Sequence, residues 1–233
     1  MKSIINIVIL SFPLALFAQK ADSVKKDVPK EKVSYLPTGI RVGTDLISLI
    51  RSQTDKGFSG YEINADVDFY RYYLAVEAGK WEKNFSTDVE KYNNNGTYGR
   101  VGVDVNFLLK DPDKNMFFFG IRYAQGTYSE DLTVKTDDPV WGTMETTYTN
   151  SNMTARWGEA TTGLRVKMWK FFWMGYTARL KFGLNTDKPG GLISYDIPGY
   201  GKTANDTTWG FNYQILFRIP FRKVFRLRGL RLR

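Results

Sequence analysis

The 233-residue sequence contains no cysteine and no histidine. Without cysteine, the chain has no disulfide framework, no thiolate catalysis and no zinc–thiolate site. Without histidine, it lacks the usual general base and the commonest metal ligand. These two absences remove most familiar active sites, so we expect the protein not to be an enzyme and to bind no cofactor and no metal.

Long hydrophobic runs are also missing beyond the N-terminus. No segment after the first twenty residues contains eighteen consecutive apolar residues, which excludes a bundle of transmembrane helices. The composition is nevertheless 42% hydrophobic and 15% aromatic, which is too apolar for a disordered chain. The sequence therefore predicts a folded protein that can enter a membrane only through β-strands.

The first eighteen residues have the pattern of a secretory signal peptide. Lys2 supplies a positive start, residues 4–17 form a short apolar region, and Ala18 is a small residue at its end. A buried N-terminal helix is the alternative, but Pro13 lies inside the apolar run and charged residues follow it abruptly. We assign residues 1–18 to the signal peptide and residues 19–38, rich in Lys, Asp and Pro, to a polar periplasmic tether.

From residue 39 onward the dominant hydrophobic period is two, as in β-strands. Apolar and polar residues alternate without a break across residues 61–69 and 101–107, and seven apolar positions alternate strictly across residues 172–184. Strands of soluble domains usually have about five or six residues, whereas a tilted membrane-spanning strand needs roughly nine to eleven. The longest of these segments is long enough to span a membrane.

Eight segments share this pattern, and their connections alternate between short and long. The predicted strands are residues 39–49, 58–69, 72–82, 97–109, 116–128, 155–168, 172–184 and 207–219. The short connections are Arg71 and residues 111–115 and 169–171, and the long ones are residues 50–57, 83–96, 129–154 and 185–206. An even number of strands, with short turns on one side and long loops on the other, is typical of outer-membrane barrels.

This pattern resembles the small eight-stranded outer-membrane β-barrels of Gram-negative bacteria, in particular families without an assigned activity. The resemblance covers nearly the whole mature chain and rests on pattern, not on a diagnostic motif. It implies an all-β fold: an up-and-down antiparallel transmembrane β-barrel over residues 39–221, with short periplasmic turns, longer extracellular loops and both termini in the periplasm. A soluble lipocalin-type barrel is the alternative, in which apolar residues line a ligand cavity and charges face outward.

The polar face of the predicted strands carries charges of both signs. The interior of an eight-stranded barrel is just wide enough for its own side chains to fill it. Seven acidic and eight basic residues are predicted to face inward, so nearly all of them can pair, and we predict a closed lumen. This predicted lumen charge network consists of Arg41, Asp45, Glu62, Asp66, Asp68, Glu77, Arg100, Asp104, Arg122, Glu159, Arg165, Lys167, Arg179, Lys181 and Arg218.

Aromatic residues gather around the short connections. Tyr70, Tyr72 and Tyr73 flank the first, and residues 117–119 and 171–173 follow the other two. Aromatic rings with an apolar body and a polar tip form girdles at membrane interfaces, and we interpret these clusters in that way.

A basic segment ends the chain. The six basic residues of the predicted tail are Arg222, Lys223, Arg226, Arg228, Arg231 and Arg233. They supply most of the net charge of +9, and we assign residues 222–233 to a periplasmic tail that docks on anionic lipid headgroups or on an acidic partner protein. A solvated tail without a partner is the alternative. Nucleic acid is not an expected partner of a secreted chain.

These observations predict a non-enzymatic outer-membrane barrel that acts through its loops, its tail or its outer wall. The first interpretation is an accessory or structural subunit of a larger outer-membrane assembly, with outer-membrane lipid and other outer-membrane or periplasmic proteins as partners. A stand-alone adhesion or envelope-stability barrel is the alternative. A narrow channel and a secreted ligand-binding β-barrel are the third and fourth interpretations.

Overall fold

The computed structural model describes residues 34–186, 193–203 and 207–221. The predicted signal peptide (1–18), most of the predicted tether (19–38) and the predicted basic tail (222–233) lie outside these residues. The described end of the tether is bonded to the folded part of the chain. The backbone N–H of Thr38 donates to Asp68 Oδ1 at 2.8 Å, and the rings of Tyr35 and Tyr70 meet edge to face.

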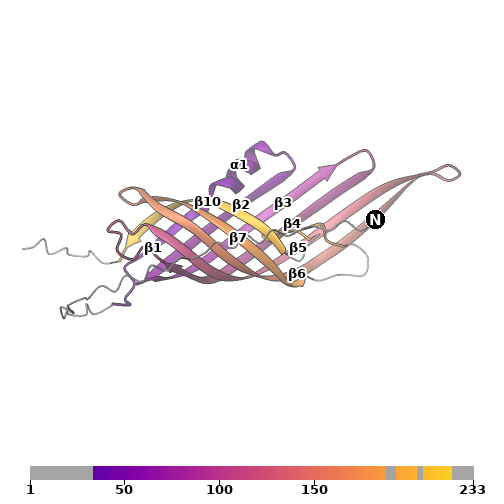
Figure 1. The fold of residues 1–233 in the computed structure, drawn as a ribbon. Helices are drawn as coiled ribbons and strands as arrows, with labels where there is room; N and C mark the ends of the chain where they lie inside the picture. The colour runs from indigo at the N-terminus through magenta and orange to yellow at the C-terminus, as the bar shows by residue number, and fades with distance from the viewer. Residues whose placement is uncertain (1–33, 187–192, 204–206, 222–233) are drawn as a thin grey trace, which may run out of the picture. The chain divides into compact units, whose positions relative to one another are not determined.

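Eight long antiparallel strands close into a ring (Figure 1). Around the ring the order is β1, β10, β7, β6, β5, β4, β3 and β2, so strands adjacent in sequence are adjacent in space and the last strand pairs with the first. The strands are β1 (Gly39–Asp45), β2 (Phe58–Phe69), β3 (Tyr72–Ser86), β4 (Glu90–Asn106), β5 (Met116–Asp138), β6 (Gly142–Trp169), β7 (Phe172–Thr186) and β10 (Thr207–Pro220). The predicted all-β class and the eight antiparallel strands are confirmed.

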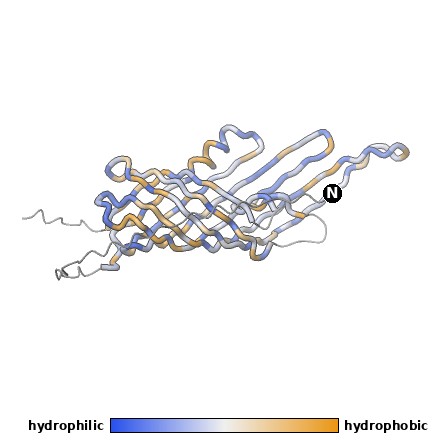
Figure 2. The backbone as a smooth tube through the Cα atoms, in the orientation of Figure 1, coloured by the Kyte–Doolittle hydropathy of each residue, from blue (hydrophilic) through white to orange (hydrophobic). Residues whose placement is uncertain are grey.

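The alternation in the sequence fixes which side of each strand faces the interior. In β2, residues of the polar set, such as Glu62 and Asp66, are buried, whereas Tyr61 and Ile63 are exposed. Figure 2 shows the same alternation of hydrophilic and hydrophobic positions along the tubes of the other strands. The apolar side chains therefore cover the outside of the ring, and the polar ones fill it.

The register places opposite charges on neighbouring strands side by side. Arg41 of β1 pairs with Asp66 of β2, and Glu77 of β3 pairs with Arg100 of β4. Directly opposed side chains of antiparallel strands lie close enough to interact, so each such pair favours this register over a slipped one.

The two ends of the ring differ. At one end, called the turn end below, two-residue turns join β2 to β3 and β6 to β7, and residues 107–115 join β4 to β5. Tyr70 and Lys170 have positive φ angles of 63° and 27° at the first positions of these tight turns. The opposite end, called the loop end, carries a helix, two long hairpins and the segment between β7 and β10.

The prediction of a first strand over residues 39–49 was wrong beyond Asp45. The strand ends there, and α1 (Leu46–Thr54) begins. The carboxylate of Asp45 caps the helix by accepting from the backbone N–H of Ser48 at 3.0 Å. The apolar residues Leu46, Ile47, Leu49 and Ile50 follow helical spacing, but the first three were read as a continuation of the strand. The predicted long loop 50–57 was wrong as far as Thr54, because these residues belong to α1.

The predicted long loops 83–96 and 129–154 were also wrong, because most of both segments is strand. β3 and β4 pair as far as Ser86 and Lys91, and β5 and β6 pair as far as Asp138 and Gly142. The outer part of the β5–β6 hairpin extends beyond the other strands (Figure 1). Most of its side chains are exposed on both faces, so the sequence there lacks the hydrophobic alternation that marks a half-buried strand.

The segment 185–206, predicted as an open loop, includes a small hairpin. β8 (Asp196–Ile197) and β9 (Gly201–Lys202) pair with each other, and Ile197 and Tyr200 are buried. They pack against Tyr98, Trp157 and other aromatic residues on the inward faces of the ring strands. Within the described part of the chain, no helix is long and apolar enough to cross a bilayer.

Candidate functional site

The ring interior contains a network of buried ion pairs in two connected clusters. The cluster nearer the turn end is built on two aspartates. Asp66 accepts from Arg41 Nε at 2.8 Å and also from Arg165 Nη1. Asp104 accepts from Arg122 Nη1 at 2.7 Å. All five side chains are at most 5% exposed, so the carboxylates and guanidinium groups compensate one another away from bulk water.

The second cluster lies nearer the loop end and is built on three glutamates. Arg100 contacts Glu62 at 2.6 Å, Glu77 at 3.1 Å and Glu159 at 2.9 Å. Arg179 contacts Glu77 at 2.8 Å and Glu159 at 2.9 Å. The two guanidinium groups therefore share their carboxylates and tie β3, β4, β6 and β7 together across the interior.

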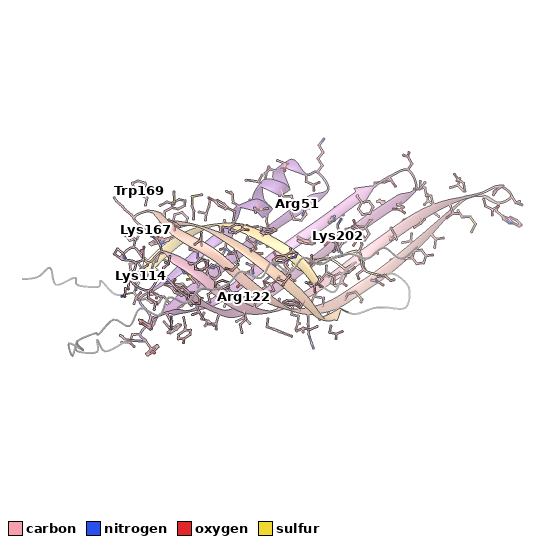
Figure 3. The ribbon with its side chains drawn as sticks, in the orientation of Figure 1. Arg51, Lys114, Arg122, Lys167, Trp169 and Lys202 are labelled. Carbon is pink, nitrogen blue, oxygen red and sulfur yellow. The ribbon has the colours of Figure 1, made fainter. Side chains whose placement is uncertain are left out.

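A single longer contact joins the clusters. Arg122 Nε lies 3.6 Å from Glu77 Oε1, so the interior charges form one continuous network. Arg122 lies in the middle of the ring, whereas Lys114, Lys167 and Trp169 lie at the turn end (Figure 3). Each of the five carboxylates in the two clusters thus contacts at least one guanidinium group.

The remaining predicted network residues lie near the ends of the ring. Asp68 pairs with Arg218 at 2.8 Å near the turn end, where Arg218 is half-buried. Lys167 pairs with Asp113 at 2.8 Å, and both side chains are partly exposed. Asp45 caps α1 and also accepts from the backbone N–H of Tyr213 at 2.9 Å. Thirteen of the fifteen predicted residues are thus buried, and two lie at the rim.

Lys181 lies opposite Glu159 in the β6–β7 register but, within the described part of the chain, makes no ion pair at 4.0 Å or less. Its Nζ donates to the carbonyl oxygens of Gly199 and Tyr200, at 2.8 and 2.9 Å. Arg100 Nη2 also donates to Gly199 O, at 2.9 Å. These bonds hold the β8–β9 hairpin inside the loop end of the ring, where it narrows the interior.

The hairpin depends on a glycine that the sequence analysis missed. Gly199 has a φ of +80°, and a Cβ atom there would lie 2.5 Å from the ring of Tyr98. Only glycine combines this backbone conformation with so close an approach. The Pro198–Gly199 pair was the available signal, since this dipeptide marks a turn, although it does not reveal where the turn packs.

A further polar cluster at the loop end was also missed. Glu130 is 1% exposed and accepts from Tyr92 Oη at 2.9 Å, Asn150 Nδ2 at 2.8 Å and Ser194 Oγ at 2.6 Å. Glu130 and Asn150 belong to the segment that was assigned to a loop, so the two residues were not expected to be buried together. Among the described residues, no group of three acidic side chains has the arrangement of a metal site.

The comparison with protein families matches residues 1–224 to a family described as a domain of unknown function, DUF6048. The chain belongs to the DUF6048 family. A comparison with curated proteins finds no match.

The outer surface of this DUF6048 chain is apolar around the ring. Large hydrophobic side chains on the outward faces are more than one-third exposed. They include Ile63, Val76, Val101, Val103, Phe119, Ile121, Leu164, Tyr176, Phe211 and Phe217. Exposed apolar side chains therefore occur on the outward faces of most strands of the ring.

The aromatic residues at the turn end divide between the two faces. Tyr72 and Phe119 are exposed on the outside, and the ring of Phe119 contacts Phe117 at 5.3 Å between centroids. Tyr73 and Phe118 point inward instead and form a buried cluster with Met116. Trp173 is likewise buried, at 4% exposed. The girdle interpretation was therefore wrong for Tyr73, Phe118 and Trp173.

The tip of the β5–β6 hairpin presents two exposed apolar side chains. Val140 and Trp141 are each 79% exposed, the highest values among the large hydrophobic residues described. Asp138 shapes the turn by accepting from the backbone N–H groups of Trp141 and Val140, and these bonds lower the pKa of its carboxyl group. The tip is thus a fixed turn that carries apolar groups away from the ring.

Proposed function

We propose that this protein is a closed outer-membrane β-barrel without enzymatic activity, which serves as an accessory or structural subunit of a larger outer-membrane assembly. The observation that carries the proposal is the inverted sorting of its faces. Charged side chains fill the interior, and apolar side chains cover the outside. A soluble barrel has the opposite arrangement.

The energetics of a bilayer account for this sorting. A closed ring of strands satisfies its backbone hydrogen bonds internally, which a bilayer requires of any spanning structure. A Lys or Arg at the bilayer midplane on the lipid side of such a barrel costs about 2 to 4 kcal/mol. Outward positions near strand middles, such as Val103, Ile121 and Tyr176, are uncharged. The exposed aromatic residues at the turn end suit the headgroup region.

The filled interior supports a structural role over transport. The ion-pair network spans the ring, and the β8–β9 hairpin occupies its loop end. Side chains of the described residues occupy the interior, which supports a closed barrel over a channel. The engagement of the buried carboxylates with arginines also favours a structural use of these groups over acid–base catalysis.

The projecting β5–β6 hairpin supports a role in assembly. Val140 and Trp141 expose apolar surface at the tip of the hairpin. Apolar and aromatic anchors of this type dominate protein–protein contacts. The same hairpin supports the second candidate, a stand-alone adhesion barrel, because it lies at the loop end, which faces the exterior in the proposed orientation.

Two measurements test this proposal. Cell fractionation should recover the protein in the outer membrane, and its migration on gels should change on heating, as the closed barrel unfolds. Recovery as a soluble protein without detergent would contradict the membrane location. Affinity purification in a mild detergent then separates the two candidates, since a stoichiometric membrane complex supports the subunit role and a lone barrel supports the adhesion role.

A further inference from the structure

The edges of β2 and β6 at the loop end differ in how their backbone groups are bonded. β1 pairs with β2 only as far as Ile63, and α1 covers the edge beyond it. There Ser52 Oγ donates to Gly60 O and accepts from Gly60 N–H, both at 2.7 Å. On β6, pairing with β5 extends to Gly142, whereas pairing with β7 begins only at Ala155 (Figure 1). The outer part of β6 therefore has β5 on one side and, among the described strands, none on the other.

The register shows which residues of β6 present backbone groups at this open side. Lys135 of β5 donates its N–H to Val89 O, on the β4 side, at 2.8 Å, although Lys135 lies opposite Glu145 of β6. In an antiparallel ladder, such a pair directs the N–H and C=O groups of both residues away from each other. Every second residue of β6 near Glu145 therefore points its backbone groups to the open side. These residues, called the free edge of β6 below, are Thr143, Glu145, Thr147 and Thr149.

The free edge lacks the features that usually prevent strand addition. Natural edge strands are protected by lysine, by proline or by a bulge that twists the edge away. Residues 143–149 contain neither lysine nor proline, and their pairing with β5 is regular, because the bulge lies nearer the ring, at Tyr128 and Glu130. Their single charge, on Glu145, is paired with Lys135 of β5 at 3.1 Å. At about 3.4 Å per residue these residues span roughly 24 Å, which is enough for a strand of average length.

One face of the hairpin beside the free edge is largely apolar. Leu132 lies opposite Tyr148 on this face, and Val134 and Met144 share it. Met144 and Tyr148 belong to β6 and are 57% and 44% exposed. A strand added to the edge would place every second side chain on this face. Apolar side chains at those positions would cover Met144 and Tyr148.

The opposite face of the hairpin is polar and acidic. Its charged residues on β5 and β6 are Asp131, Lys135, Asp137 and Glu145, all exposed. Lys91 of β4 shares this face but lies beyond β5 from the edge. Lys135 pairs with Glu145, so β5 and β6 keep two further carboxylates that basic side chains of an added strand would compensate. A second copy of the same edge, paired antiparallel, would instead set two acidic faces side by side. The charges therefore favour a different protein as the partner.

We propose that the free edge of β6 takes up an extended segment of a partner protein as an additional strand, in which apolar residues alternate with basic ones. Backbone hydrogen bonds to the free edge supply affinity, and the two faces of the hairpin select the pattern and the register of the segment. This inference rests on the proposed subunit role and names the contact through which that role is exercised.

The first test measures binding of a short fluorescent peptide to the full chain in detergent micelles, by fluorescence anisotropy. The peptide alternates valine with lysine, and the control peptide has the same composition with the valines and the lysines in separate blocks. We expect the alternating peptide to bind at least about tenfold more tightly than the control. Equal binding of the two peptides would contradict strand addition.

A third peptide tests the charge of the partner. It alternates valine with glutamate and should bind at least about tenfold more weakly than the valine–lysine peptide. Non-specific attraction would give the reverse order, because the chain carries a net charge of +9. Equal or tighter binding of the acidic peptide would overturn the assignment to a basic segment.

Two variants test the edge itself. Thr147→Pro removes an edge donor but no hydrogen bond to β5, since the N–H of Thr147 points to the open side. It should weaken binding of the valine–lysine peptide about tenfold or more. Thr147→Ala keeps the N–H and is the matched control, which should bind as the parent chain does. Equal affinities of the two variants would exclude the edge as the site.

Amide hydrogen exchange in the parent chain needs no substitution. The N–H groups of Glu145 and Thr147 should exchange faster than those of Met144 and Thr146, which bond to β5. The valine–lysine peptide should slow the first two about tenfold or more and leave the second two unchanged. If the peptide binds without slowing Glu145 and Thr147, it does not pair with the edge and the inference is wrong.

Affinity purification from membranes in a mild detergent separates this inference from the proposed function. The Thr147→Ala variant should recover the same stoichiometric complex as the parent chain, and Thr147→Pro should not. If both variants recover the complex, the inference fails and the subunit role stands. If the peptide pairs with the edge but the parent chain recovers no complex, the subunit role fails and the strand-addition site stands.

Discussion

The turn-end half and the loop-end half of the ring are held together in different ways. In the turn-end half, every strand has two strand neighbours, and arginines and carboxylates at most 5% exposed pair across the interior. In the loop-end half, a helix replaces one strand, hairpins extend beyond the ring, and pairs such as Lys135–Glu145 are about half exposed. Buried ion pairs are present in both halves. The comparison teaches that complete strand pairing fixes the first half, whereas the second also depends on a helix and on individual side-chain contacts.

The largest expected difference in stability is between the loss of a buried carboxylate and the loss of an exposed one. Glu77→Ala removes a buried carboxylate that contacts three arginines, and it should lower the free energy of unfolding by about 3 to 5 kcal/mol. Glu145→Ala, at an exposed pair in the β5–β6 hairpin, should lower it by less than about 1 kcal/mol. Urea unfolding in detergent micelles measures both, and equal losses would mean that the interior network contributes no more than surface pairs.

The next prediction compares an arginine introduced on the apolar outer wall with one introduced in the projecting hairpin. Val103→Arg places a charge on the apolar wall and should cost about 2 to 4 kcal/mol, seen as reduced insertion into vesicles. Thr149→Arg, in the projecting hairpin opposite Asp131, should insert as the parent chain does. Normal insertion of the Val103 variant would contradict a lipid-facing wall.

A smaller effect is expected where α1 substitutes for a strand. Ser52→Ala leaves the N–H and C=O of Gly60 without their partner and should destabilise the protein by about 1 to 3 kcal/mol. Gln53→Ala, at an exposed helix position, should change the stability by no more than about 0.5 kcal/mol. Identical unfolding curves for the two variants would show that the helix does not seal the edge of β2.

The smallest effect on stability should come from shortening the β5–β6 hairpin. Replacing residues 135–145 with Asn-Gly joins Val134 to Thr146, which are paired, through a favourable two-residue turn. The barrel should still fold and shift on heating, with a change in unfolding free energy below about 1 kcal/mol, but it should no longer be recovered with partner proteins. Undiminished recovery would exclude the hairpin as the assembly surface.

The two halves also differ in how far the sequence predicts them. Strands such as Phe58–Phe69 were predicted to the residue, because each has one apolar and one polar face along its whole length. α1 was missed because its first apolar residues directly follow the strand and were read as part of it. The change from the period of two to helical spacing occurs only beyond Asp45. The projecting hairpin was missed because solvent contacts both its faces, which removes the alternation.

The sequence also predicted the interior only in part. The charged residues from Arg41 to Arg218 were assigned to the correct face by parity alone, since a strand turns alternate side chains to the same side. The alternation of side chains along a strand gives no distances between strands, so the contacts of Glu77 with three arginines could not be predicted. The β8–β9 hairpin depends on contacts such as Gly199 with Tyr98, about a hundred residues apart, which no local pattern records.

Single cysteines in this cysteine-free chain test the central claim most directly. In lipid vesicles, Ala178→Cys and Thr162→Cys, on the outward faces, should react with a lipid-soluble maleimide but not with a membrane-impermeant one. Thr177→Cys and Thr161→Cys, each one residue away and buried inside, should react with neither reagent until the protein unfolds. Rapid reaction of the Ala178 and Thr162 variants with the impermeant reagent would contradict a membrane-embedded barrel with an apolar outside and a charged, closed interior.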